Sequence, residues 1–265
     1  MIFLLAALIY FIAPVLISSS AEMFGHGRQE KGAQEFSQVL WPETAMVATL
    51  LVAVVLIGWL QQTGLTTRMN VIPLFFAVPY VLFVLVIAAV PLLVADSQGQ
   101  ALTLTAPDWR FISLSALAAL LVGAFEELLF RGVLLHGLRT KMAAVTAVFV
   151  SAAIFGAFHF VNWVGGQPID VTVMQVLGAA GGGVFYGAMV LWTGSLWSSI
   201  VLHGVWDTGV TVSQTLQSKS ATVVAETAET TPSPVSALAS PELIYGLIIL
   251  GLWWMWSKRQ KRRAS

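Results

Sequence analysis

The chain has 265 residues, of which 57% are hydrophobic and 10% are charged, and its formal net charge is zero. Its mean hydropathy of +0.83 is far above that of a soluble domain and predicts a protein that crosses a membrane several times. The balanced charge gives no sign of a nucleic-acid or acidic partner, and the absence of cysteine excludes disulfides, thiolate metal ligands and a cysteine nucleophile.

The apolar runs, taken in chain order, predict an all-α fold, a polytopic membrane bundle of about eight transmembrane helices. The expected spans are Ile2–Ile17, Ala45–Leu60, Val71–Ala95, Phe111–Leu138, Met142–Val161, Val171–Trp192, Leu196–Val212 and Leu243–Trp256. Because no basic residues precede the first run, we expect a retained helix there, although the small residues that follow it would suit a processing enzyme. The polar segments 19–43, 96–110 and 216–240 are expected to be loops.

Two features of the later spans bear on packing and orientation. The sixth expected span holds four glycines at small-xxx-small spacing, which predicts close approach of helix backbones: Gly178, Gly182, Gly183 and Gly187. The last span ends in three tryptophans and is followed by five basic residues. Aromatic and then basic residues at a helix end are typical of a cytoplasmic boundary, so we expect a cytoplasmic C-terminus.

The segment 126–131, Glu-Glu-Leu-Leu-Phe-Arg, places three ionisable side chains in a run that is otherwise apolar enough to cross a bilayer. Charge at that depth is costly and usually faces a polar interior. Glu127 and Arg131 are four residues apart, so they share a helical face and we expect them to pair as a structural brace. Glu126 lies about 100° around the helix and is left unpaired there, which makes it the candidate catalytic carboxylate.

Partners for Glu126 are found in two later apolar segments. His159 ends the pattern Phe155-x-x-x-His, and His203 precedes Asp207 by four residues, which places the imidazole and the carboxylate on one face. Glu126, His159, His203 and Asp207 thus come from three spans. So many titratable groups in apolar helices indicate a functional site.

Two hydrolytic mechanisms fit these residues. In one, Glu126, His159 and His203 bind zinc, because two histidines and one glutamate are a common catalytic ligand set with an open position for water. In the other, no metal is present: Glu126 and His159 hold and deprotonate a water, and His203 with Asp207 stabilises the oxyanion.

We favour the metal-free mechanism because the Glu127–Arg131 brace suits a base whose ionisation must be tuned, a task that zinc would perform by itself. The competing interpretations are a purely structural ion pair and a proton-coupled transporter, which also uses intramembrane Glu and His. We find no internal repeat of the kind that many transporters contain.

Three patterns in this order resemble the motifs of the CAAX protease and bacteriocin-processing (CPBP, or Abi) family of intramembrane proteases. They are Glu-Glu-x-x-x-Arg at 126–131, Phe-x-x-x-His at 155–159 and His-x-x-x-Asp at 203–207. The resemblance implies that Glu126 is the catalytic base, His159 its water-holding partner, and His203 with Asp207 the oxyanion or ligand side. Many members carry Asn where this chain has Asp207, and the family has been described both as zinc-dependent and as glutamate-dependent.

The resemblance also sets expectations for the whole chain. We expect an intramembrane endopeptidase in a prokaryotic plasma membrane that cuts a membrane-associated peptide or protein, with or without a lipid anchor. The alternatives are a proton-coupled transporter and a non-catalytic bacteriocin-immunity protein. The expected parts are N-terminal helices and loops in 1–110, a catalytic core in 111–215, and a flexible loop, final helix and basic tail in 216–265.

Overall fold

The structure is a computed structural model that describes residues 33–99, 102–219 and 241–264, with side chains from Leu40 onward. All regular elements within these ranges are helices. In the described part of the chain, four helices are long and apolar enough to cross a membrane: Ile72–Ser97, Ala106–Arg139, Ala144–Val164 and Ile169–Thr193. The described part of the chain is thus an all-α membrane protein. The expected count of about eight spans is not confirmed, and the first expected span lies outside the described residues.

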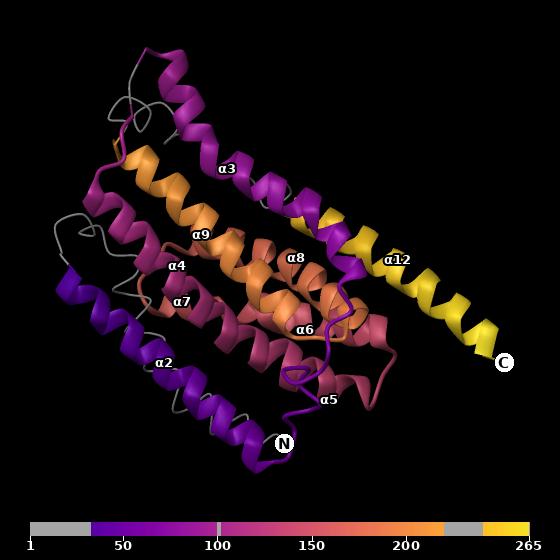
Figure 1. The fold of residues 1–265 in the computed structure, drawn as a ribbon. Coiled ribbons are helices and arrows are strands. Elements are labelled where there is room, and N and C mark those ends of the chain that lie inside the picture. Colours follow the sequence, from indigo (N-terminus) through magenta and orange to yellow (C-terminus); the bar gives the residue numbers. More distant parts are fainter. Residues whose placement is uncertain (1–32, 100–101, 220–240, 265) are drawn as a thin grey trace.

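The helices form two layers (Figure 1). The first layer contains, side by side, α2 (Ala33–Leu56), α4 (Ala106–Glu127), α9 (Trp197–Lys219) and α3 (Val78–Ser97). The second contains α6 (Ala144–Phe158), α8 (Ile169–Thr193) and α12 (Pro241–Ala264), with α8 in contact with both others and also with α9. Short helices join these: η1 (Ile72–Ala77), η2 (Leu128–Leu135), α5 (His136–Arg139) and α7 (Phe160–Val164).

Several helices extend into segments expected to be loops. Helix α4 begins at Ala106 because Thr105 caps it, donating its backbone N–H to the Asp108 carboxylate at 2.6 Å. Helix α9 continues to Lys219, whose ammonium lies 2.5 Å from the same carboxylate. This ion pair joins the start of α4 to the end of α9, so both ends are ordered by a tertiary contact.

The outer helices are longer than expected as well. Helix α2 begins at Ala33 and contains Pro42, so residues 33–43 are helical where we expected a loop. Helix α12 continues through the basic tail to Ala264, where the cations lie in the last turn and complement the helix dipole. The expected orientation of this tail stays a prediction.

The motif helix changes geometry at its functional segment. The α-helix ends at Glu127 and continues as the π-helix η2 from Leu128 to Leu135. This wider winding is rare in proteins in general, and where it occurs it is often at a functional site. Ser151 of α6 donates its hydroxyl to the Phe130 carbonyl of this turn at 2.9 Å. The sequence pattern predicted one continuous span and gave no sign of this change.

Glycine packing between α6 and α8 agrees in part with the small-residue pattern. A Cβ on Gly183 would lie 2.9 Å from Ala152, and one on Gly187 would lie 3.1 Å from Val148, both on α6. Gly178 has no neighbour within 4 Å, so it takes no part in the contact. The α6 side contributes Gly156, whose added Cβ would lie 2.5 Å from the Val176 carbonyl of α8.

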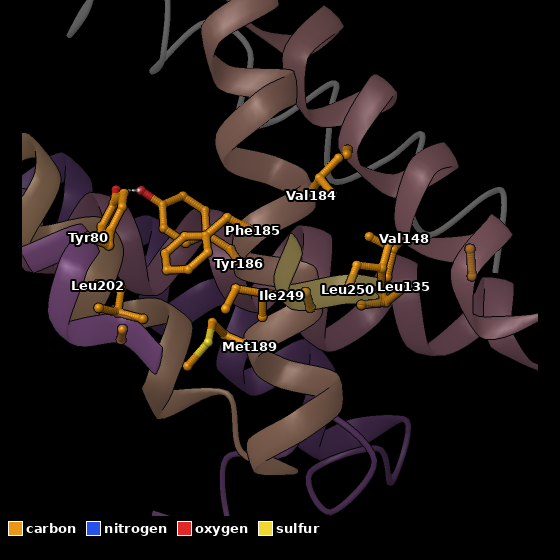
Figure 2. Close-up of a cluster of buried hydrophobic side chains, with 14 of the residues drawn as sticks. Tyr80, Leu135, Val148, Val184, Phe185, Tyr186, Met189, Leu202, Ile249 and Leu250 are labelled. Carbon is orange, nitrogen blue, oxygen red and sulfur yellow. Dashed lines mark hydrogen bonds between the residues drawn. The ribbon is translucent and has the colours of Figure 1, made fainter. Parts of the chain in front are cut away.

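A cluster of buried apolar side chains packs between α3, α6, α8, α9 and α12 (Figure 2). Its fully buried members include Phe185 and Met189 of α8 and Ile249 of α12. Outside this core, large apolar side chains such as Leu82, Leu85 and Leu93 of α3 are exposed, as expected for helices that face lipid.

Candidate active site

The two glutamates of the motif lie in the last turn of α4, inside the bundle. Glu126 is 8% exposed and Glu127 is fully buried. The π-helix that follows carries Arg131, which is 2% exposed. The expected ion pair forms, because Arg131 Nη1 lies 2.7 Å from Glu127 Oε1.

Glu127 has a second partner that sequence reasoning did not foresee. The same atom, Glu127 Oε1, lies 3.0 Å from His203 Nδ1 on α9. Since a carboxylate oxygen accepts, the imidazole donates from Nδ1, which places a proton on that nitrogen and leaves Nε2 for other partners. Glu127 therefore connects Arg131 to His203 and is more than a brace for the arginine.

His203 lies at the centre of three carboxyl groups. Its Nε2 atom is 3.5 Å from Glu126 Oε2 and 3.5 Å from Asp207 Oδ2, while its Nδ1 atom faces Glu127. The two 3.5 Å separations are ion-pair distances rather than good hydrogen bonds. Glu126, without a partner on its own helix, thus faces an imidazole from another. The Asp207 side chain is 34% exposed, so this edge of the group is the more accessible one.

Glycines allow α4 and α9 to approach closely enough for these contacts. A Cβ on Gly123 would lie 3.3 Å from the Ile200 carbonyl and 3.4 Å from His203 Cβ. A Cβ on Gly204 would lie 2.7 Å from Leu120 of α4. Glycine at 123 and at 204 therefore sets the helix separation at which His203 reaches both glutamates.

Aromatic rings and a further glycine enclose the guanidinium of Arg131. Its Cζ atom lies 4.2 Å from the centre of the Phe155 ring and 5.4 Å from that of Tyr186, distances that suit cation–π attraction. On the α8 side, a Cβ on Gly183 would lie 3.1 Å from Nη2. The glycine pattern that we assigned to helix packing thus also makes room for the buried cation.

His159 lies at the break between α6 and α7, next to the group rather than within it. Its Nδ1 atom is 3.0 Å from the Phe155 carbonyl, which can only accept, so Nδ1 carries the proton and a neutral ring leaves Nε2 as an acceptor. The Phe155 ring contacts both imidazoles edge-on, at 5.0 Å from His159 and 5.9 Å from His203. No direct contact between His159 and Glu126 is found among the described residues, and their convergence on one cavity stays a prediction.

Three buried polar atoms of this site have no hydrogen-bond partner within the described part of the protein. They are Glu126 Oε2, Glu127 Oε2 and Arg131 Nη2. Buried polar groups in proteins are nearly always hydrogen-bonded, so groups of this kind need an explanation. They are available to bind water or a polar substrate group.

The residues were tested against the zinc alternative. The donor types suit zinc, and each imidazole has its Nδ1 atom engaged, as is common for metal-bound histidine. However, no three His, Asp or Glu side chains of residues 40–99, 102–219 and 241–263 form a group that could hold a metal ion. Glu126, His159 and His203 are not arranged as a ligand set, and no step below uses a metal.

Comparison with known families covers the part of the chain that holds this site. Residues 108–209 match the family described as Rce1-like, type II CAAX prenyl endopeptidase. This segment is similar to that family. The Rce1-like segment includes α4, η2, α6, α8 and the part of α9 that carries His203 and Asp207, and the family implies a protease. No curated protein and no solved structure matches the chain.

Glu43, outside the Rce1-like segment, is a site neighbour that sequence reasoning missed. It is 2% exposed and shares a buried stripe of α2 with Met46, Leu50 and Val54. Its carboxyl group interacts electrostatically with that of Glu126. The helical spacing to Met46 and Leu50 was a usable signal, but we had placed residue 43 in a loop.

Tyr80 and Tyr186 were missed as well. The Tyr186 ring is stacked on the His203 imidazole, with centroids 5.0 Å apart and planes 10° apart. Tyr80, from α3 and outside the Rce1-like segment, forms a hydrogen bond to the Tyr186 hydroxyl. Nothing in the local sequence around either tyrosine indicates a contact with histidine, because the partners are supplied by three separate helices.

Proposed function

We propose that the chain is an intramembrane endopeptidase of the CAAX type that cleaves a peptide bond of a membrane-associated substrate. The observation that carries the proposal is the group around His203, in which one imidazole faces Glu126, Glu127 and Asp207 inside the bundle. A Glu–Arg pair serving structure alone would not require the imidazole of another helix, with a third carboxyl group beside it.

Glu126 is assigned as the general base. Its Oε2 atom is buried, has no hydrogen-bond partner in the described chain, and faces the His203 ring, so it is placed to accept a hydrogen bond from a water molecule. A positioned general base contributes about 10²–10⁴-fold to a reaction rate. His159 is assigned as the second group on that water, because the unprotonated Nε2 atom of its neutral ring is an acceptor.

His203 is assigned to the carbonyl side of the reaction. Glu127 holds the ring by Nδ1, and the Nε2 atom faces Glu126 and Asp207, where it can be protonated. There it can donate to the oxyanion that forms when the carbonyl is attacked, which is a large contribution in a site shielded from bulk water. Asp207 stabilises the charged imidazole and, if protonated, is itself a donor.

The proposed steps are balanced in atoms and protons. The water oxygen forms a bond to the carbonyl carbon as Glu126 takes one of its protons, and the carbonyl oxygen becomes an oxyanion. The carbon–nitrogen bond then breaks, and Glu126 returns the proton to the departing amine. The products are a new carboxylic acid and a new amine, the acid then loses its remaining proton to the amine or to water, and Glu126 ends as the carboxylate with which it began.

The test uses purified protein in lipid nanodiscs and a peptide that ends in a farnesylated cysteine and three further residues. We expect release of the last three residues, followed by mass spectrometry, and at least about a 10²-fold loss in Glu126→Gln. Glu242→Gln on α12 is the matched control, because Glu242 is also 8% exposed. Cleavage by Glu126→Gln at the wild-type rate, with both variants equally abundant, would refute the assignment of Glu126.

The same peptide without the farnesyl group tests the substrate class. Equal cleavage of both peptides identifies a membrane peptide substrate that needs no lipid anchor, whereas cleavage of the farnesylated peptide alone identifies a lipidated one. The wild-type protein is also tested on membrane peptides extracted from a strain that lacks it. If it cuts neither the two synthetic peptides nor any of these extracted peptides, the proposed function is contradicted.

A further inference from the structure

Three aromatic side chains form a closed arrangement with His203, and none of them stands at a fixed position of the motifs that identify the site. Tyr186 of α8 is stacked on the imidazole, with centroids 5.0 Å and planes 10° apart. Tyr80 of α3 is stacked on Trp206 of α9, with centroids 6.2 Å and planes 24° apart. Because Trp206 is three residues beyond His203, the arrangement starts and ends on one face of α9. We call Tyr80, Tyr186 and Trp206 the aromatic clasp.

The two tyrosines of the clasp are joined by their hydroxyl groups. The oxygen atoms are 2.9 Å apart, and both residues are 3% exposed (Figure 2). The surroundings are apolar, since Phe185 lies 4.4 Å from the Tyr80 ring and belongs to the same buried cluster. A hydroxyl that lost its partner there would be left unsatisfied, so the bond fixes both rings.

Helix α3 is held against α9 closely enough to keep Tyr80 in place. A Cβ on Gly209 would lie 2.3 Å from Val84 Cγ1 of α3, so only glycine fits at this contact. Val84 is one turn beyond Tyr80 on the same face of α3, and both are buried. The position of Tyr80 thus follows from the close packing of the Val84 side chain of α3 against Gly209 of α9.

We propose that Tyr186 is a positioning residue for His203, and that Tyr80 acts through it; the proposal rests on the proposed peptidase function. Glu127 anchors the imidazole at Nδ1 but leaves rotation about that hydrogen bond free. The flat contact with Tyr186 removes this freedom, and the direction of Nε2 toward Glu126 and Asp207 becomes defined. Helix α3 therefore contributes to the site although it lies outside the Rce1-like segment.

The first test is a double-mutant cycle on kcat and KM for the farnesylated peptide. Tyr80→Phe and Tyr186→Phe each remove the hydroxyl contact and keep the ring, so we expect each to lower kcat about fivefold with KM unchanged. The double variant should lose no more than either single variant, because both changes break one bond. Losses that multiply in the double variant would overturn the proposal.

The matched control is Tyr245→Phe. The Tyr245 hydroxyl donates to the Phe76 carbonyl at the contact of α12 with η1, and its ring packs against Phe185 rather than against His203. It therefore reports the general effect of removing a buried tyrosine hydroxyl. A kcat loss equal to that of Tyr80→Phe would mean that the effect is structural, and would overturn the proposal.

The second test does not depend on activity. In protein labelled with ¹⁵N-histidine, the His203 imidazole signals are assigned with His203→Gln and compared between wild type and Tyr80→Phe. We expect a shifted or broadened His203 signal in Tyr80→Phe and an unchanged one in Tyr245→Phe. An unchanged signal in Tyr80→Phe overturns the positioning role, whereas absence of peptide cleavage by the wild type contradicts only the proposed function.

Discussion

The α4–α9 and α6–α8 interfaces achieve the same closeness by the same means and use it differently. Both depend on glycine, with Gly123 and Gly204 between α4 and α9, and Gly156 and Gly183 between α6 and α8. Across α6–α8 the contacts are mainly apolar, such as Ala152 against Gly183. Across α4–α9 the contact brings ionisable groups together, with His203 against both glutamates.

The difference shows that close helix packing in a membrane is general, whereas function comes from the side chains at the interface. Without a hydrophobic driving force between helices in lipid, small residues allow association in both cases. The apolar interface follows in part from glycine spacing, through Gly183 and Gly187. The polar one must also place each charge beside a partner, since a lone charge at that depth is costly.

The largest expected effect breaks the polar interface by stranding a charge. Arg131→Ala leaves Glu127 buried without its cation, and removing one partner of a buried pair costs about 3–5 kcal/mol. We expect the protein to be lost from the membrane fraction or to unfold at a much lower temperature. Glu127→Gln combined with Arg131→Met should be milder, because neither charge remains. Strictly additive losses in abundance would show that the two residues do not act as a pair.

The next effect breaks the apolar interface. Gly156→Ala would place a methyl group 2.5 Å from the Val176 carbonyl, and we expect a loss of about 1–3 kcal/mol, as for overpacking of a filled core. Gly178→Ala is the control on the neighbouring helix, because nothing lies within 4 Å of the added atom. Thermal unfolding of the two variants in detergent measures the difference, and equal stability would mean that α6 and α8 are not in close contact.

A substitution at the polar interface should lower stability less than one at the apolar interface but should reduce activity. Gly123→Ala adds a methyl group 3.3 Å from the Ile200 carbonyl, which α9 can accommodate by moving a few tenths of an ångström. We expect under about 1 kcal/mol of stability loss, but roughly a tenfold loss of kcat because His203 moves relative to Glu126. A variant that keeps full activity would show that the site tolerates a shift of α9.

The smallest expected effect is none. If protein contacts alone hold the polar interface, prolonged treatment with a zinc chelator should change neither the unfolding temperature nor peptide cleavage. Elemental analysis of the same sample is the accompanying measurement. Stoichiometric zinc that is lost together with stability, and whose return restores both, would show that a metal ion helps to hold these side chains.

Local spacing determined much of this protein. Apolar runs predicted the four helices of the described residues that are long and apolar enough to cross a membrane, although the expected count of about eight is not confirmed. The four-residue spacing of Glu127 and Arg131 predicted their pairing, because it follows from helix geometry and the cost of buried charge. The order of three motifs indicated the family, whose match covers residues 108–209. Helix ends were predicted less well, because α4 and α9 are extended by a contact between Asp108 and Lys219.

Only the tertiary structure decided which groups share a partner. That Glu127 binds both Arg131 and His203, and that Tyr80 reaches the site through Tyr186, depends on the separation and rotation of helices far apart in the chain. Periodicity places a side chain on a face of its own helix but carries no information on which helix that face meets. Here that choice depends on close glycine contacts such as Gly123 with the Ile200 carbonyl of α9 and Gly209 with Val84 of α3.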